Sequence, residues 1–229
     1  MVELDIYNRQ KDLELEVPKS VAVIGVGGVG SWVAVNLALV GVKKIVLVDH
    51  DIIEPHNLNR TLFKLEHIGL PKVEAVADLI LERREDVQVI PIPKKVEQLN
   101  NKEMKLVKSA EIIVDGRDSI DPLPEELQKK NIITGGYDGT SITIFFHPAK
   151  KERTAWGDAD EPIRYTITPS YLVPPQLIAN VITAFITSGA YKHLTEPRTV
   201  SFDVKDLLTT LYNYGELVVK MGEKVMAKW

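Results

Sequence analysis

Four glycines and one acidic residue are spaced as in a nucleotide-binding site. The segment from Gly25 to Gly30 reads GVGGVG, which fits the G-x-G-x-x-G fingerprint, and it lies between an apolar run and a helical pattern. The glycines permit a tight turn and let backbone N–H groups approach phosphates closely. They are Gly25, Gly27, Gly28 and Gly30. Asp49 ends the next apolar run, where a carboxylate can bind both ribose hydroxyls. A nicotinamide dehydrogenase would fit the same residues. Other features must therefore distinguish a dehydrogenase from a protein that binds a nucleoside triphosphate.

The residues after Asp49 favour a triphosphate. Arg60 and Lys72 add positive charges that redox cofactor binding does not require. A triphosphate attacked at its α-phosphorus needs positive charge near the β- and γ-oxygens, to stabilise the departing pyrophosphate. Lys72 stands in the first turn of an expected helix, where a cation is unfavourable unless an anion is bound beside it. Either cation alone would be an ordinary surface charge, but together with the glycine loop they predict a triphosphate site.

Strands that end at one edge of a sheet must position these residues. Short apolar runs typical of buried parallel strands alternate with helical patterns. The expected strands are 21–24, 44–49, 87–92 and 111–115, and the expected helices are 31–40, 72–85 and 97–108. Gly41 suits the C-cap of the first helix. This alternation predicts an α/β fold with a doubly wound Rossmann-like sheet that is parallel in its N-terminal half.

The second half of the chain changes character. Strands are expected over 131–135, 141–147 and 199–204, and the alternating pattern of 141–147 indicates antiparallel strands at the solvent edge. A helix is expected over 175–193, whereas 205–229 fit either a helix or a hairpin. We interpret 1–229 as a single domain, with an N-terminal arm (1–19), a nucleotide-binding core (20–147), a charged loop (148–169) and a C-terminal helix and strand region (170–229).

The composition excludes several classes of protein. Of 229 residues 45% are hydrophobic and none is cysteine, so disulfides, thiolate zinc sites and cysteine nucleophiles are excluded and no zinc is expected. The net charge of -4 is spread along the chain, which argues against a nucleic-acid partner. No secretory signal begins the sequence, and its longest apolar stretch, 177–191, is too short and too polar to cross a membrane. We expect a soluble, cytoplasmic protein.

Taken together, the motifs resemble the MoeB/ThiF family of adenylyltransferases, which shares its adenylation domain with ubiquitin-activating enzymes. The resemblance runs from about Tyr7 to Thr143. It begins with the segment YNRQ at 7–10, which is similar to the family's R-Y-x-R-Q element. The resemblance implies that Arg9 reaches the nucleotide phosphates of a partner subunit, and hence a homodimer.

The resemblance also assigns the other residues. It implies that Gly25, Gly27, Gly28 and Gly30 line the nucleotide, that Asp49 holds the ribose with support from Asp51, and that Asn57, Arg60 and Lys72 contact phosphates. Catalytic roles are thereby implied for Arg9, Arg60, Lys72 and Asp118. ATP and Mg²⁺ are the implied cofactors, with Asp118 as the metal ligand because it matches the acid of the family's D-x-x-D-N element.

The chain departs from the family pattern in two respects, around Asp118 and in its lack of cysteine. Ser119 stands where asparagine is usual, and Arg117 adds a cation beside Asp118, where it could lower the pKa of that acid or contact substrate. The paired C-x-x-C zinc site and the thioester- or persulfide-forming cysteine of many relatives are both missing. The resemblance therefore implies a reaction that stops at the acyl-adenylate unless another protein accepts the acyl group.

The implied substrate is the C-terminal glycine of a ubiquitin-like or sulfur-carrier protein, activated with release of pyrophosphate. The glycine-rich segment 135–139 resembles the stretch near the bound carrier tail, and 148–169 lie where relatives carry a crossing loop. Other readings stay open: adenylation of a peptide or of a modified tRNA, or a nucleotide-binding scaffold without turnover.

Overall fold

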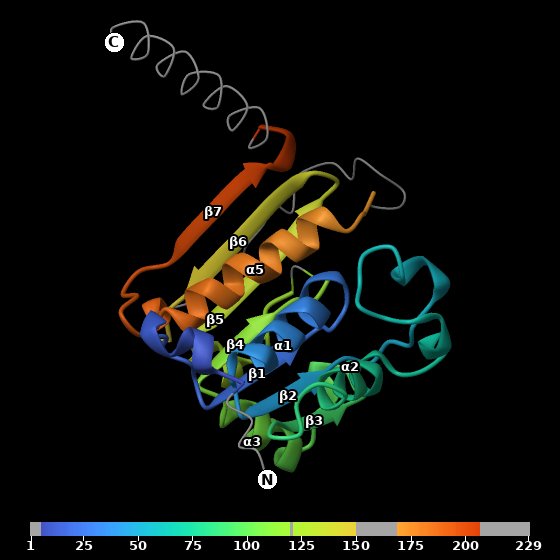
Figure 1. The fold of residues 1–229 in the computed structure, drawn as a ribbon, viewed down its shortest axis with the longest axis horizontal. Coiled ribbons are helices and arrows are strands. Elements are labelled where there is room, and N and C mark those ends of the chain that lie inside the picture. The colour runs from blue at the N-terminus through green and yellow to red at the C-terminus, as the bar shows by residue number, and fades with distance from the viewer. Residues whose placement is uncertain (1–5, 120, 150–168, 207–229) are drawn as a thin grey trace, which may run out of the picture.

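The computed structural model describes residues 6–119, 121–149 and 169–206. Within them lies one seven-stranded sheet of order β3-β2-β1-β4-β5-β6-β7 (Figure 1). The strands are β1 (Ser20–Ile24), β2 (Lys44–Val48), β3 (Gln88–Ile92), β4 (Ile112–Asp115), β5 (Ile132–Asp138), β6 (Ser141–His147) and β7 (Arg198–Asp203). Pairing is parallel from β3 through β5 and antiparallel for β6 and β7. The predicted doubly wound α/β sheet with antiparallel C-terminal strands is confirmed.

Helices cover both faces of the sheet. They are α1 (Gly28–Val40), α2 (Lys72–Leu81), α3 (Asn101–Lys108), α4 (Glu125–Gln128) and α5 (Val173–Thr187). One apolar cluster joins α1, α2 and α5 to one face, and a second joins α3 and α4 to the other. Short 3₁₀ helices are η1 (Asn8–Leu13), η2 (Pro55–Asn57), η3 (Leu65–His67), η4 (Val96–Gln98) and η5 (Ala190–Lys192).

Capping residues explain where the helices differ from the predicted bounds. The helix expected over 97–108 begins at Asn101, because the Asn100 side chain accepts hydrogen bonds from the backbone N–H groups of Lys102 and Glu103. The helix expected over 175–193 begins earlier, with prolines in its first turn, and ends at Thr187. Gly41 caps α1 as predicted, with a φ of 114° that favours glycine. Most of the loop 148–169 and of 205–229 lies outside the described residues.

Candidate active site

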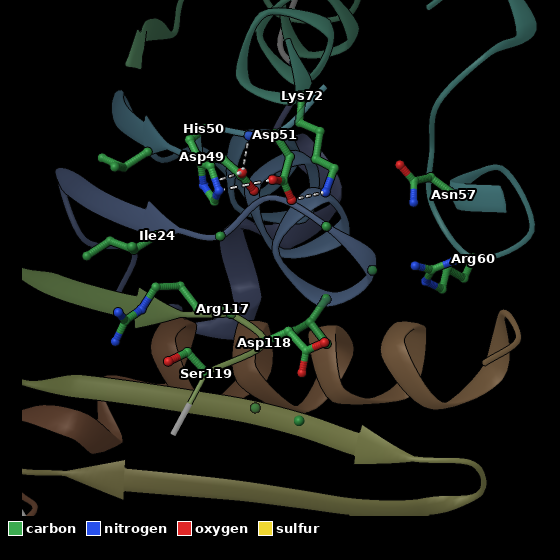
Figure 2. A pocket seen from close by; sticks show the side chains of 18 of the residues that line it. Ile24, Asp49, His50, Asp51, Asn57, Arg60, Lys72, Arg117, Asp118 and Ser119 are labelled. Atoms are coloured by element: carbon green, nitrogen blue, oxygen red, sulfur yellow. Dashed lines mark hydrogen bonds and ion pairs between the residues drawn. The ribbon is translucent and has the colours of Figure 1, made fainter. Parts of the chain in front are cut away.

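A cavity of about 1240 Å³ opens at the carboxyl edge of the sheet, where strands β1, β2, β4 and β5 end (Figure 2). It brings together most residues predicted from the sequence: Gly25, Gly27, Gly28, Asp49, Asp51, Asn57, Arg60, Lys72 and Asp118. Gly30 and Arg9 do not line it. Because small-molecule pockets span roughly 300–1,000 Å³, the cavity has room for a nucleotide and part of a second substrate.

The glycines of the loop between β1 and α1 have different tasks. Gly25 has a φ of 80°, and a Cβ atom there would lie 2.6 Å from the Arg117 backbone nitrogen. A Cβ atom on Gly30 would collide with the Gly25 carbonyl oxygen, so these two glycines are needed to close the turn. No atom lies within 4 Å of the position that a Cβ atom on Gly27 would occupy. Gly27 therefore leaves the backbone at the start of α1 open to a ligand.

The Asp49 carboxylate is held in one orientation at the end of β2. Its oxygens accept hydrogen bonds from the backbone N–H groups of Val26, at 2.8 Å, and Asp51, at 2.9 Å. Each carboxylate oxygen has two acceptor sites, so both can still accept a hydrogen bond from a ligand hydroxyl. Because Val26 belongs to the glycine loop, this hydrogen bond also ties the end of β2 to that loop.

Lys72 and Asp51 form an ion pair beside this loop. The Lys72 Nζ lies 2.7 Å from an Asp51 carboxylate oxygen, and the lysine side chain is only 12% exposed. Burial raises the pKa of Asp51, but the hydrogen bond and charge of Lys72, with smaller contributions from His50 and Lys95, outweigh it and hold the pKa below its usual value. Lys72 therefore has a fixed position and a negative partner before any ligand binds.

Arg60 has only neutral hydrogen-bond partners among the described residues. Its Nη1 donates to the carbonyl oxygen of His56, at 2.7 Å, and to the side-chain oxygen of Asn59, at 3.2 Å. Its Cδ atom lies 3.7 Å from the position of a Cβ atom on Gly28, so the side chain crosses the start of α1. The side-chain oxygen of the buried Asn57 accepts from the Glu54 backbone N–H at 3.0 Å and so braces the turn before Arg60.

Asp118 and Arg117 face different parts of the cavity. Asp118 is exposed on the cavity wall, and no hydrogen bond or ion pair engages its carboxylate within the described part of the chain. The expectation that Arg117 adds its charge beside Asp118 is wrong. The guanidinium points away from Asp118 and binds Asp115 and Glu97 (Figure 2). Burial lowers the pKa of Arg117, but the hydrogen bond and charge of Asp115, with Glu97 and Asp121, raise it above the usual value.

Several cavity residues were not predicted as site residues, among them Tyr137 and Ser170. The Tyr137 hydroxyl lies 2.7 Å from the Ser170 hydroxyl, and the side-chain amide of Asn59 donates to the Ser170 carbonyl oxygen at 2.9 Å. These contacts connect β5, the start of the α5 region and the loop that carries Arg60. The glycine-rich segment had drawn attention to this strand, but only the fold brings Tyr137 to Ser170, 33 residues away. Gly135 is required for packing, because a Cβ atom there would collide with Ile178 on α5.

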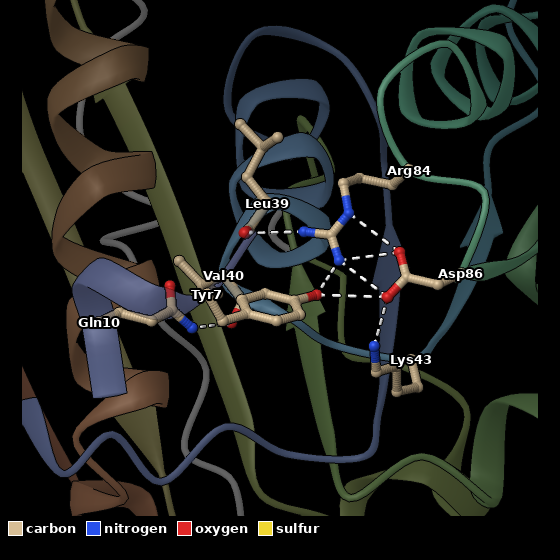
Figure 3. A network of polar contacts seen from close by, with 7 residues as sticks. All are labelled: Tyr7, Gln10, Leu39, Val40, Lys43, Arg84 and Asp86. Carbon is tan, nitrogen blue, oxygen red and sulfur yellow. Dashed lines mark hydrogen bonds and ion pairs between the residues drawn. The ribbon is translucent and has the colours of Figure 1, made fainter. Parts of the chain in front are cut away.

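Arg9 lies far from the cavity of its own chain. It is exposed on η1, which packs against the C-terminal end of α1, whereas the cavity lies at the N-terminal end. The neighbouring Tyr7 hydroxyl binds Arg84, and Gln10 donates to the Val40 carbonyl oxygen (Figure 3). Since α1 has 13 residues, about 20 Å of helix separates its two ends. An Arg9 that acts in a nucleotide site would therefore act in that of another chain.

Comparison with solved structures supports the fold. The chain resembles E. coli MccB, crystallised with ATP, with a TM-score of 0.62 over 81% of this chain and 63% of that one, at 21% sequence identity. The model of the ThiF family matches residues 7–140. That is more than half of the sequence, and the chain therefore belongs to the ThiF family.

Curated relatives match a shorter stretch. The ubiquitin-like modifier-activating enzyme 5 of Caenorhabditis briggsae is 44% identical over 79 residues, which are 34% of this chain and 18% of that protein. The catalytic subunit of the NEDD8-activating enzyme E1 of Arabidopsis thaliana is 38% identical over 102 residues, 44% of this chain and 22% of that one. The matched stretch is thus less than a quarter of either relative. Among the described residues, no helix is long and apolar enough to cross a membrane.

Proposed function

We propose that this chain uses ATP to adenylate a carboxylate, and that the substrate is the C-terminal glycine of a ubiquitin-like or sulfur-carrier protein. The observation that carries the proposal is the arrangement of charge around the cavity. Arg60, without a carboxylate partner, and Asp118, without any described partner, face one cavity at the N-terminus of α1. A triphosphate with its cation would supply the charges that both side chains lack.

Each residue then has a chemical task. Asp49 binds the ribose hydroxyls, and the open backbone at Gly27 binds phosphate oxygens. A carboxylate oxygen of the carrier attacks the α-phosphorus, and the bond from that phosphorus to pyrophosphate breaks. Arg60 and Lys72 stabilise the negative charge that gathers on the leaving pyrophosphate. The polar contacts of both cations hold them in place before reaction, which reduces the cost of reorganisation.

The donor set at Asp118 fits a magnesium ion. Hard divalent cations prefer carboxylate and phosphate oxygens, and Mg²⁺ is usually bound by one or two carboxylates together with substrate phosphates. When bound, Mg²⁺ would neutralise charge on the triphosphate. Asp49, His50 and Asp51 also lie close enough to one another to hold an ion. Asp49 already accepts two backbone hydrogen bonds and Asp51 is paired with Lys72, so Asp118 is the better candidate.

The carrier tail would enter beside β5. Gly135 and Gly136 line the cavity, and the lack of a side chain at Gly136 suits the narrow passage of a tail that ends in glycines. One curated relative is named as an enzyme that activates a ubiquitin-like modifier, and the other as the catalytic subunit of an enzyme that activates NEDD8. This sequence contains no cysteine, so an acyl-adenylate made here would pass its acyl group to another protein. Arg9 of a second copy would complete the phosphate site in a homodimer.

Pyrophosphate exchange tests this proposal. Labelled pyrophosphate should enter ATP when the chain is mixed with magnesium and a small protein ending in Gly-Gly, and the same protein lacking its last glycine is the matched control. Exchange that occurs with a peptide or a modified tRNA, and with none of the carriers, would keep the adenylation reaction but replace the substrate. Tight ATP binding without exchange on any carboxylate would identify a scaffold.

A further inference from the structure

Almost all of the N–H donors along the edge of the Arg117 guanidinium are already hydrogen-bonded within the chain. Its Nε donates to one oxygen of Asp115 at 2.9 Å, and its Nη2 donates to the other at 3.1 Å. The same Nη2 donates to the backbone carbonyl of Asp121 at 2.8 Å, and Nη1 donates to Glu97 at 3.1 Å. Four of the five N–H donors of an arginine are thus used within the chain.

These contacts prevent Arg117 from acting as a phosphate ligand. Binding a phosphate edge-on would require Arg117 to release Asp115, a carboxylate that is only 1% exposed. A buried charge that loses its partner is strongly destabilising. The Arg117 side chain is itself only 14% exposed, yet it lines the cavity. Apart from one N–H of Nη1, the part of the guanidinium that remains for a ligand is therefore its flat face.

The position of Arg117 points to the base of the nucleotide. Asp115 ends β4, Glu97 follows β3, and the cavity wall beside them includes Ile24, Val48 and Val96. Figure 2 shows Arg117 on the same side as Ile24, opposite Arg60 and Asn57. A nucleotide with its phosphates near Arg60 and its ribose on Asp49 would thus extend its base toward Arg117 and this apolar wall.

We propose that Arg117 determines base specificity by stacking the face of its guanidinium on the purine ring of the nucleotide. The inference rests on the proposed function, because it takes a nucleoside triphosphate as the ligand. A planar cation attracts the face of an aromatic ring, and the interaction strengthens where water is excluded. Purines offer a larger ring surface than pyrimidines, so Arg117 favours ATP over CTP. The contacts to Asp115, Glu97 and Asp121 hold the plane ready for stacking.

The test variant is Arg117→Lys, which keeps a cation for Asp115 but removes the plane. Calorimetric titration should show that its affinity for magnesium ATP falls about tenfold, as expected for a desolvated cation–π contact. Its affinity for inorganic tripolyphosphate, which has no base, should stay within about twofold, since Arg117 does not touch phosphates. The ratio of the affinities for ATP and CTP should be smaller in Arg117→Lys than in the wild type. Arg83→Lys, at an exposed arginine that does not line the cavity, is the matched control and should change none of these values.

A second measurement does not depend on a stable variant. With the wild-type chain, magnesium ATP should bind more tightly than magnesium CTP, because the purine offers the larger ring surface to Arg117. Equal affinities for ATP and CTP, or equal losses of ATP and tripolyphosphate affinity in Arg117→Lys, would overturn the stacking role. Failure of the proposed function would give a different result. ATP would bind with the expected dependence on the base, but no pyrophosphate exchange would occur. That result would support stacking on Arg117 and contradict the adenylation reaction.

Discussion

The two ends of helix α1 hold similar residues in opposite electrostatic conditions. At its C-terminal end, Arg84 is 5% exposed and donates to Asp86, to the Leu39 carbonyl and to the Tyr7 hydroxyl, while Lys43 also pairs with Asp86 (Figure 3). At its N-terminal end, Arg60 has neutral partners and Asp118 has none among the described residues.

This difference separates a structural network from a binding site. Both cations of the Arg84 network, Arg84 and Lys43, are paired with the carboxylate of Asp86, so the network is satisfied within the chain and serves to fix the N-terminal arm against α1. The charges around the cavity are left incomplete, at a cost in stability that ligand binding would offset. The unpaired charges, rather than the number of charged residues, therefore mark the site. Changes at the two ends should affect different properties.

Asp118→Asn should have the largest effect on activity. The amide keeps the shape of the side chain but loses the charge, so pyrophosphate exchange should fall by a factor on the order of 1,000 at saturating magnesium. ATP affinity should stay within about tenfold, or roughly 1.4 kcal/mol, because ribose and phosphate contacts do not depend on this carboxylate. Near wild-type exchange would move the metal role to another residue, which would not be Asp115, since Asp115 is buried and does not line the cavity. Matched melting curves control for folding.

Arg60→Met should slow exchange without weakening the fold. The substitution removes a cation from the proposed pyrophosphate site, and loss of one such donor typically costs about 100-fold in rate. The free energy of unfolding should change by less than about 0.5 kcal/mol, because Arg60 has no charged partner to leave behind. Exchange kinetics and urea unfolding, measured on the same preparation, check both halves of this prediction. A large loss of stability would place Arg60 with the structural network instead.

Arg84→Met should show the reverse pattern. Loss of the buried guanidinium removes the hydrogen bond to the Leu39 carbonyl and leaves Asp86 with Lys43 as its cation, and we expect the free energy of unfolding to fall by about 2 kcal/mol. ATP affinity should be unchanged, because the cavity lies at the other end of α1. Urea unfolding and ATP titration below the melting temperature test this. Loss of ATP affinity without loss of stability would contradict the division between the two ends.

Arg9 should act across a dimer. When chains carrying Arg9→Ala and Asp118→Ala are mixed and exchange subunits freely, half of the dimers are hybrids and each hybrid has one intact site. Exchange activity should therefore recover to about a quarter of the wild-type value, whereas either variant alone is inactive. No recovery, despite hybrid formation shown by native mass spectrometry, would remove the role of Arg9 in the partner's site.

Acid should cause a small loss of stability through Asp51. Its folded-state pKa lies below the usual value of 3.8, so the ion pair with Lys72 stabilises the fold above that pH. This contribution is lost as the pH falls from 3.8 through the lower folded-state pKa. The effect should be modest, because Asp51 is partly exposed. The test is the urea midpoint of unfolding, measured at several pH values in this window. As the pH is lowered, the midpoint should fall less steeply for Lys72→Met than for the wild type.

Local patterns made the sheet predictable, and contacts between distant loops limited the prediction of the site. The glycine loop, Asp49 and the two cations all follow strand ends, so a parallel sheet gathers them at one edge, as the sequence indicates. The direction of the Arg117 guanidinium depends on Glu97, which is 20 residues away, and on the burial of Asp115. Because Arg117 and Asp118 are neighbours in the sequence, a contact between them was expected. The burial of Asp115 and its two hydrogen bonds with the guanidinium turn Arg117 toward Asp115 instead.

The most direct test of the account is a calorimetric titration of the wild-type chain with magnesium ATP and, separately, with NAD. The glycine loop and Asp49 fit both ligands, and only the incomplete charges at Arg60 and Asp118 distinguish them. We expect magnesium ATP to bind at least about tenfold more tightly than NAD, and Arg60→Met to reduce this difference in affinity. Tight binding of NAD with no binding of ATP would contradict it.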